Sequence, residues 1–86
     1  MKTFTCKILH PDGLHARPAA EFCKTATGFK SKITLTKDGE DFEAKSILMV
    51  LSAGVAHGDE VTITANGEDE KEAIEALKNL LTSHGE

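Results

Sequence analysis

Four short segments of this 86-residue chain alternate apolar and polar side chains, which is the pattern of strands with one buried face. They are residues 3–9, 32–36, 40–44 and 60–66. Strands that alternate in this way are typical of an antiparallel sheet with one covered face and one solvated face. The covering helices must come from the segments between and after the strands, so the pattern predicts a two-layer α+β domain.

Helical periodicity follows the first, third and fourth of these strands. One helix is expected after His15, and a brief one is capped by the Ser46 hydroxyl and ends near Gly54. A last helix begins near Asp69, which together with Glu72 resembles a capping box. The side chains expected to face the core from these helices are Ala19, Phe22, Cys23, Ala26, Ile47, Val50, Leu51, Ala73, Ile74, Leu77, Leu80 and Leu81.

The predicted order of elements is β-α-β-β-α-β-α in a single domain that covers residues 1–86. A chain of this length buries one modest core. The dipeptide Asp38-Gly39 predicts a hairpin between the second and third strands. The pattern does not fix the order of the strands in the sheet, and a ferredoxin-like order is an alternative.

Composition and charge exclude several classes of protein. The net charge of −4 argues against a nucleic-acid partner, which a basic face usually binds. No apolar run approaches a membrane span and no secretory signal follows Lys2, so we expect a cytoplasmic protein without membrane insertion. Cys6 and Cys23 do not make the disulfide framework of a secreted domain, although the sequence leaves a bond between them open.

The strongest candidate for chemistry is His15, at the start of a predicted helix. Gly13 allows a tight turn before it. If Ala16 is the first helical residue, the N–H groups of Ala16 and Arg17 point back towards the imidazole and favour an anion there. The planar guanidinium of Arg17 also suits phosphate oxygens. The sequence therefore predicts that His15 is a nucleophile that can carry a phosphoryl group.

Taken alone, a surface histidine with a nearby arginine usually has no function. The run Gly13-Leu14-His15-Ala16-Arg17-Pro18-Ala19, however, resembles the active-site motif of HPr, the family of histidine-containing phosphocarriers of the bacterial phosphotransferase system. Further segments also resemble that family: Ala44-Lys45-Ser46-Ile47-Leu48, Ser52-Ala53-Gly54-Val55 with Gly58, and Gly67-Glu68-Asp69-Glu70. The resemblance covers essentially the whole chain.

The resemblance implies an open-faced β-sandwich with strand order 1-4-2-3 and three helices on one face. It implies that His15 accepts a phosphoryl group on Nδ1 from phosphorylated enzyme I, which obtains it from phosphoenolpyruvate. His15 then passes the group to enzyme IIA domains of sugar permeases, with Arg17 as its charge partner. The protein would be a monomeric carrier, not an enzyme, without cofactor or metal. Asp12 departs from the Ser, Thr or Asn common in the family, and its carboxylate could compete for Arg17.

The same resemblance makes Ser46 a candidate for regulatory phosphorylation, with a kinase/phosphorylase and a catabolite control regulator as further partners. The simpler interpretation is that Ser46 only caps its helix. Leu48 and Met49 are expected to form an exposed patch where partners dock, or else a satellite of the core. Met49 departs from the Gly usual in Gram-positive members.

Two other functions remain open at this point. The chain could be a nitrogen-type or regulatory paralogue with its own enzyme I. It could instead be a ferredoxin-like module that binds a small molecule or a metal, with His10, His15 and either Cys6 or Cys23 as ligands. The spacing of these residues is that of no paired metal-ligand motif, so no metal is expected.

Overall fold

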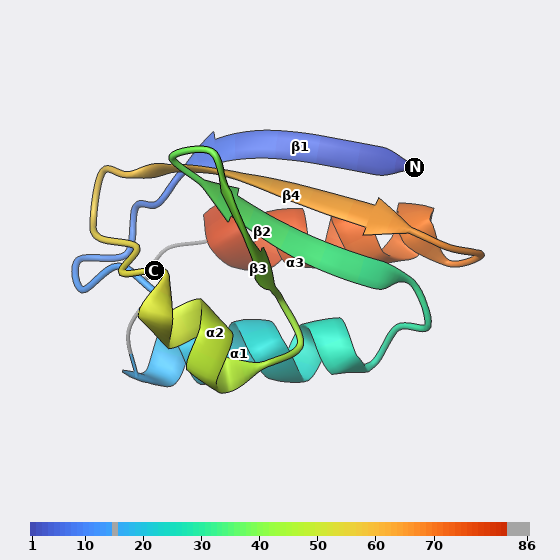
Figure 1. The fold of residues 1–86 in the computed structure, drawn as a ribbon, viewed down its shortest axis with the longest axis horizontal. Helices are drawn as coiled ribbons and strands as arrows, with labels where there is room; N and C mark the ends of the chain where they lie inside the picture. The colour runs from blue at the N-terminus through green and yellow to red at the C-terminus, as the bar shows by residue number, and fades with distance from the viewer. Residues whose placement is uncertain (15, 83–86) are drawn as a thin grey trace.

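The computed structural model describes residues 1–14 and 16–82 (Figure 1). The elements in chain order are β1 (Lys2–Lys7), α1 (Ala16–Thr27), β2 (Lys32–Lys37), β3 (Glu40–Glu43), α2 (Ile47–Ser52), β4 (Glu60–Asn66) and α3 (Glu70–Thr82). The predicted order β-α-β-β-α-β-α is confirmed. None of the helices in the described residues is long and apolar enough to cross a membrane.

The strands form one antiparallel sheet in the order β1-β4-β2-β3. Phe4 on β1 lies opposite Ile63 on β4, which lies opposite Leu35 on β2. This is the order that the resemblance implies. A ferredoxin-like sheet would have β1 in its centre, whereas β1 is an edge strand here, so the ferredoxin-like alternative is wrong.

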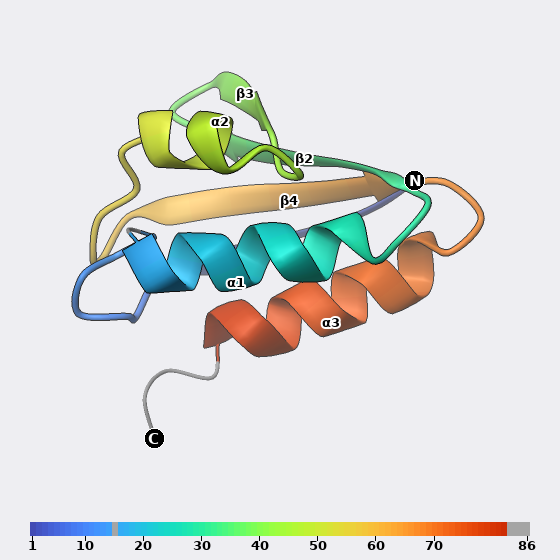
Figure 2. The ribbon, with the colours of Figure 1, turned by 90° about the horizontal axis from the view of Figure 1, so that it is seen from below.

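One face of the sheet is buried and the other is open, as the alternation predicts. The buried side chains of the two central strands are Ile33, Leu35, Val61, Ile63 and Ala65. On the open face the hydroxyls of Thr3 and Thr64, and those of Thr5 and Thr62, hydrogen-bond across β1 and β4. Figure 2 shows α1 and α3 side by side on the buried face, running in opposite directions.

The two long helices bury the stripes that the sequence predicts. The buried residues of these helices are Ala19, Phe22, Cys23, Ala26, Ala73, Leu77 and Leu81. Ile74 and Leu80 are only partly buried and pack at the margin of the core. The strand predicted to reach Leu9 ends at Lys7, and Leu9 is 42% exposed because the chain has already turned into the next loop.

α2 corrects one prediction about the core. Only Val50 of this helix is buried, whereas Ile47 and Leu51, which were expected to face the core, are 38% and 36% exposed. The helix has six residues and packs beside α1 and β3. A helix of that length presents only one position squarely to the core, so its other apolar side chains remain at the surface.

The start of α3 corrects a second prediction, because Asp69 does not form a capping box with Glu72. The Asp69 carboxylate instead accepts hydrogen bonds from the backbone N–H groups of Lys30 and Ser31 and from the Ser31 hydroxyl. Ser31 is 1% exposed, so its polar atoms need a protein partner. The N–H of Gly67 instead donates to Glu70 Oε1 at 3.0 Å, so this contact lies two residues earlier than the predicted pair.

The hydrogen bonds to Asp69 predict how the free energy of unfolding changes at low pH. The Ser31 hydroxyl, and then the Lys30 N–H, hold the pKa of Asp69 below its ordinary value of 3.8. The ionised carboxylate therefore stabilises the fold above that value, and this stabilisation is lost as the pH falls below it. We expect Asp69→Asn to lower the free energy of unfolding at neutral pH and to flatten its decline in acid, as measured by urea unfolding.

Glu68→Gln is the matched control, because Glu68 is 72% exposed and its ion pair with Lys30 contributes little. It should leave the stability at neutral pH and most of the acid decline unchanged. If both variants showed the same acid profile, Asp69 would not be the group responsible.

Candidate functional site

The chain that leads into position 15 rests on a second loop. The N–H of Gly13 donates to His10 O at 3.0 Å, and the N–H of Leu14 donates to Val55 O at 3.0 Å. Leu14 is 2% exposed and belongs to the core. Figures 1 and 2 show loop 8–14 and loop 53–59 side by side at one end of the molecule. Loop 53–59 therefore supports the chain up to Leu14, the last described residue before position 15.

Gly13 is required at this crossing of the two loops, as the sequence predicts for the turn. Its φ is +67°, a left-handed conformation that side chains disfavour. A Cβ atom on Gly13 would lie 2.3 Å from Val55 O and 2.7 Å from the Cα of Ala56. The backbone conformation disfavours any other residue at position 13, and a larger side chain would also force loop 53–59 to move.

α1 begins directly after position 15, at Ala16, and its start is exposed. Ala16 and Arg17 are both at the surface, and the first turn contains no acidic residue. Ala16 has φ +42°, which is strained for alanine and persists only where the surrounding structure imposes it. His15 itself lies outside the described residues, and with it the prediction that the N–H groups of Ala16 and Arg17 face its ring.

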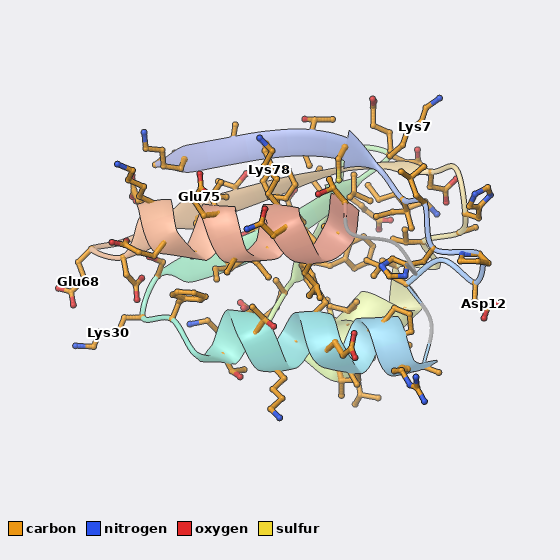
Figure 3. All side chains as sticks on the ribbon, turned by 180° about the vertical axis from the view of Figure 1, so that it is seen from behind. Lys7, Asp12, Lys30, Glu68, Glu75 and Lys78 are labelled. Atoms are coloured by element: carbon orange, nitrogen blue, oxygen red, sulfur yellow. The ribbon has the colours of Figure 1, made fainter. Side chains whose placement is uncertain are left out.

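Asp12 lies near this junction but does not neutralise Arg17. Figure 3 shows Asp12 at the tip of its loop, at the end of the molecule opposite Lys30 and Glu68. Among the ion pairs of the described residues there is none between Asp12 and Arg17. The guanidinium is therefore not committed to that carboxylate.

Ser46 caps α2, as predicted. Its backbone is extended, with φ −105° and ψ 116°, and its Oγ accepts the N–H of Met49 at 3.3 Å. The residue is partly exposed, so its hydroxyl lies at the surface of the domain. The cap accounts for one of the N–H groups that the first turn of a helix leaves unpaired.

The exposed apolar side chains of α2 form a patch, here called the α2 patch, which consists of Ile47, Leu48, Met49 and Leu51. Leu48 is 76% exposed and Met49 is 40% exposed, so the prediction of an exposed surface is confirmed and the satellite core is wrong. α2 packs over the first half of α1 and crosses it obliquely (Figures 1 and 2), which brings the patch to the side of the molecule where α1 begins.

Comparison with known proteins agrees with this geometry. A family model described as the phosphorylation site of the HPr component of the phosphotransferase system, PTS-HPr, matches residues 2–83. The chain belongs to the HPr family of phosphocarriers. The phosphocarrier protein HPr of Buchnera aphidicola is 45% identical over 76 residues, 88% of this chain and 89% of the relative. That of Mycoplasma genitalium is 43% identical over 82 residues, 94% of this chain and 93% of the relative.

A solved structure extends the agreement to the whole HPr fold. The crystal structure of HPr-C-His from Thermoanaerobacter tengcongensis matches with a TM-score of 0.95 at 48% identity, covering 96% of this chain and 93% of that one. The strand order and helix placement expected for an HPr protein are thus present in this chain.

The two thiols of this HPr-family chain are free. Cys6 is half-buried on β1 and Cys23 is buried on α1, and no disulfide joins them. Burial raises the pKa of both thiols, and the carboxylate of Glu60 raises that of Cys6 further. Within residues 1–14 and 16–82 no three His, Cys, Asp or Glu side chains gather in a way that could hold a metal ion.

The sequence does not indicate two residues that lie near the site in the folded chain. Lys37, at the end of β2, and Asp59, just before β4, hold loop 53–59 in place. Neither residue belongs to a motif, and they are 22 positions apart, which is why no local pattern indicates them. Their contacts exist only because β2 and β4 are neighbours in the sheet.

Proposed function

We propose that this protein carries a phosphoryl group on His15. Phosphorylated enzyme I donates the group, and an enzyme IIA domain of a sugar permease accepts it. A bond forms from His15 Nδ1 to phosphorus as the bond to the donor breaks, and the next transfer reverses this step. The partner enzymes supply most of the transition-state stabilisation, so the protein is a carrier that needs no cofactor.

The observation that carries this proposal is the exposed start of α1 directly after position 15. Its first turn has no acidic residue to repel a phosphate, and Arg17 adds a guanidinium that suits phosphate oxygens. The positive end of a helix favours an anion in the same place. Membership of the HPr family supports the assignment of the phosphoryl group to His15.

The α2 patch is the surface that we assign to the protein partners. An apolar patch that includes the flexible side chain of Met49 fits more than one partner, as a shared carrier must. Because α2 packs over the first half of α1, a protein docked on the α2 patch would also reach the start of α1. The relay begins with phosphoenolpyruvate, a cytoplasmic metabolite, so the proposal places the protein in the cytoplasm.

The test is incubation with phosphoenolpyruvate and enzyme I, followed by measurement of the intact mass. The proposal expects a gain of one phosphate that acid removes, since phosphohistidine is acid-labile. The phosphate should then transfer to a purified enzyme IIA domain. An unchanged mass in the presence of active enzyme I would contradict the proposal.

Ser46 is the candidate site for regulation by a kinase/phosphorylase, with a catabolite control regulator as a further partner. Its hydroxyl is at the surface and lies beside the α2 patch in sequence and in space. A phosphate there would add about 1.5 to 2 negative charges to the docking surface. Enzyme I approaches that surface with its own phosphoryl group, so repulsion should slow association first.

We therefore expect Ser46→Asp to slow phosphorylation of His15 by enzyme I, with a loss that shrinks as salt is raised. Ser46→Ala is the matched control, since it removes the bond to Met49 N without adding charge. It should cost about 1 kcal/mol of stability and change the rate little. Equal rates for the two variants at low salt would show that Ser46 is only a cap.

A further inference from the structure

A lysine on the sheet binds loop 53–59, the loop on which Gly13 and Leu14 rest. The Nζ of Lys37 donates to Ala53 O at 3.2 Å and to Gly54 O at 2.9 Å, and it lies 3.3 Å from Oδ2 of Asp59. Its side chain is only 19% exposed. An ammonium group has three N–H donors, and this one has two carbonyl acceptors and a carboxylate around it.

Asp59 extends this contact to the far end of the loop. Its Oδ2 accepts the N–H of Ala56 at 2.9 Å, and its own N–H donates to Ala56 O at 3.0 Å. Its carbonyl accepts the N–H of Ile8 at 2.8 Å, which ties the loop to the end of β1. The Ala56 N–H and then the Lys37 ammonium hold the pKa of Asp59 below its ordinary value, so the carboxylate is charged at neutral pH.

Apolar packing holds little of this loop. Only Ala53 and Val55 are buried, while Gly54, Ala56, His57 and Gly58 are exposed. Small and exposed residues leave a loop many conformations unless polar contacts restrict them. The Lys37–Asp59 pair provides such contacts at both ends of the loop. Val55 O and Ala56, on which Leu14 and Gly13 rest, lie between the two attachment points.

We propose that Lys37 is a positioning residue for phosphoryl transfer: its ammonium holds loop 53–59 in the shape on which Gly13 and Leu14 rest, and so determines where the chain presents His15. That Lys37 holds loop 53–59 is inferred from the structure alone. That this affects phosphoryl transfer rests on the proposed function. The two statements are tested by separate measurements on the same variants.

The first measurement is amide hydrogen exchange at Leu14, whose N–H is bound to Val55 O. Lys37→Met keeps the aliphatic stem and removes the three donors, while Lys37→Arg keeps a cation that can donate. We expect exchange at Leu14 to quicken by about tenfold in the Met variant and to stay near wild type in the Arg variant. Lys32→Met, an exposed lysine on the same strand, is the control for loss of charge and should change nothing at Leu14.

The second measurement is the rate of His15 phosphorylation by enzyme I as a function of the concentration of this protein. A positioning role predicts that Lys37→Met lowers the maximal rate by about tenfold, changes the half-saturating concentration less, and is rescued by Lys37→Arg. If only the half-saturating concentration rose, Lys37 would act in docking and the proposal would be overturned. It would also be overturned by unchanged exchange at Leu14, or by faster exchange with an unchanged maximal rate.

Two further controls keep the outcomes distinct. If wild-type protein gained no phosphate, the proposed function would fail, whereas the exchange experiment would still decide whether Lys37 holds the loop. If Lys37→Met also lost protection at Ile63 in the core, the variant would be unfolding globally. Asp59→Asn, which keeps the size of the side chain and removes its charge, would then decide by the same two measurements.

Discussion

We expect phosphate uptake from phosphorylated enzyme I to fall to background in the His15→Ala variant. This is the largest effect that we expect on activity, because alanine offers no nucleophile to the phosphoryl group. The guanidinium of Arg17 only donates hydrogen bonds, so it cannot replace the imidazole as the acceptor. The measurement is the gain in intact mass after incubation with phosphoenolpyruvate and enzyme I.

His57→Ala is the matched control, since His57 is an exposed histidine on loop 53–59. Its loss should leave uptake near the wild-type level. Phosphate bound to the His15→Ala variant, or a loss of uptake confined to His57→Ala, would assign the acceptor to another histidine and overturn the proposed role of His15.

The second large effect is expected for Gly13→Ala, this time on both stability and transfer. The left-handed φ of +67° costs an alanine about 1 to 2 kcal/mol. The new Cβ would also lie 2.3 Å from Val55 O, so the two loops must separate. Together we expect a loss of about 3 kcal/mol in the free energy of unfolding, in the range of overpacked sites. The rate of His15 phosphorylation should fall with it.

The variant Gly54→Ala separates the cost of the left-handed φ from the cost of the close contact. Gly54 has nearly the same φ, +63°, but a Cβ there meets nothing within 4 Å. It should therefore cost only the conformational part, about 1 to 2 kcal/mol, as measured by urea unfolding. If Gly13→Ala and Gly54→Ala were equally destabilised, the contact between Gly13 and loop 53–59 would not be a tight one.

α2 is too short to be stable as an isolated helix, so it depends on contacts at both of its ends. Ser46 pairs an N–H group at its start, and Lys37 binds the carbonyl oxygens that follow its end. The first contact can be altered by phosphorylation, and the second is fixed by the sheet. The orientation of the α2 patch therefore depends on side chains at both ends of the helix as well as on its packing against α1.

Much of the fold could be predicted from the sequence, since the deciding interactions are local. Alternation identified all four strands and their inward faces, because side chains on a strand alternate between its two faces. The cap at Ser46 and the turn at Gly13 were also predictable, as each depends on a few adjacent residues. The motif around His15 indicated the HPr family, although the geometry of His15 lies outside the described residues.

Other features depended on which segments meet in the folded chain. The order β1-β4-β2-β3 is a choice among pairings that all satisfy the same alternation, so the residues alone left it open. The exposure of Ile47 and Leu51 depends on how little of a six-residue helix its neighbours can cover. Asp69 binds Ser31 rather than its own helix because a buried serine from a distant loop reaches its carboxylate.

The contacts of Lys37 near the candidate site could not be predicted from the sequence either. In the sequence it is one more lysine, directly after the alternating segment 32–36, where an exposed cation is the ordinary expectation. The pairing of β2 with β4 brings it to Asp59 and to the end of α2, and those acceptors bind its ammonium. The residues alone determined which chemistry the chain can offer, but long-range pairing decided which side chains hold that chemistry in place, because such contacts join residues that are distant in sequence.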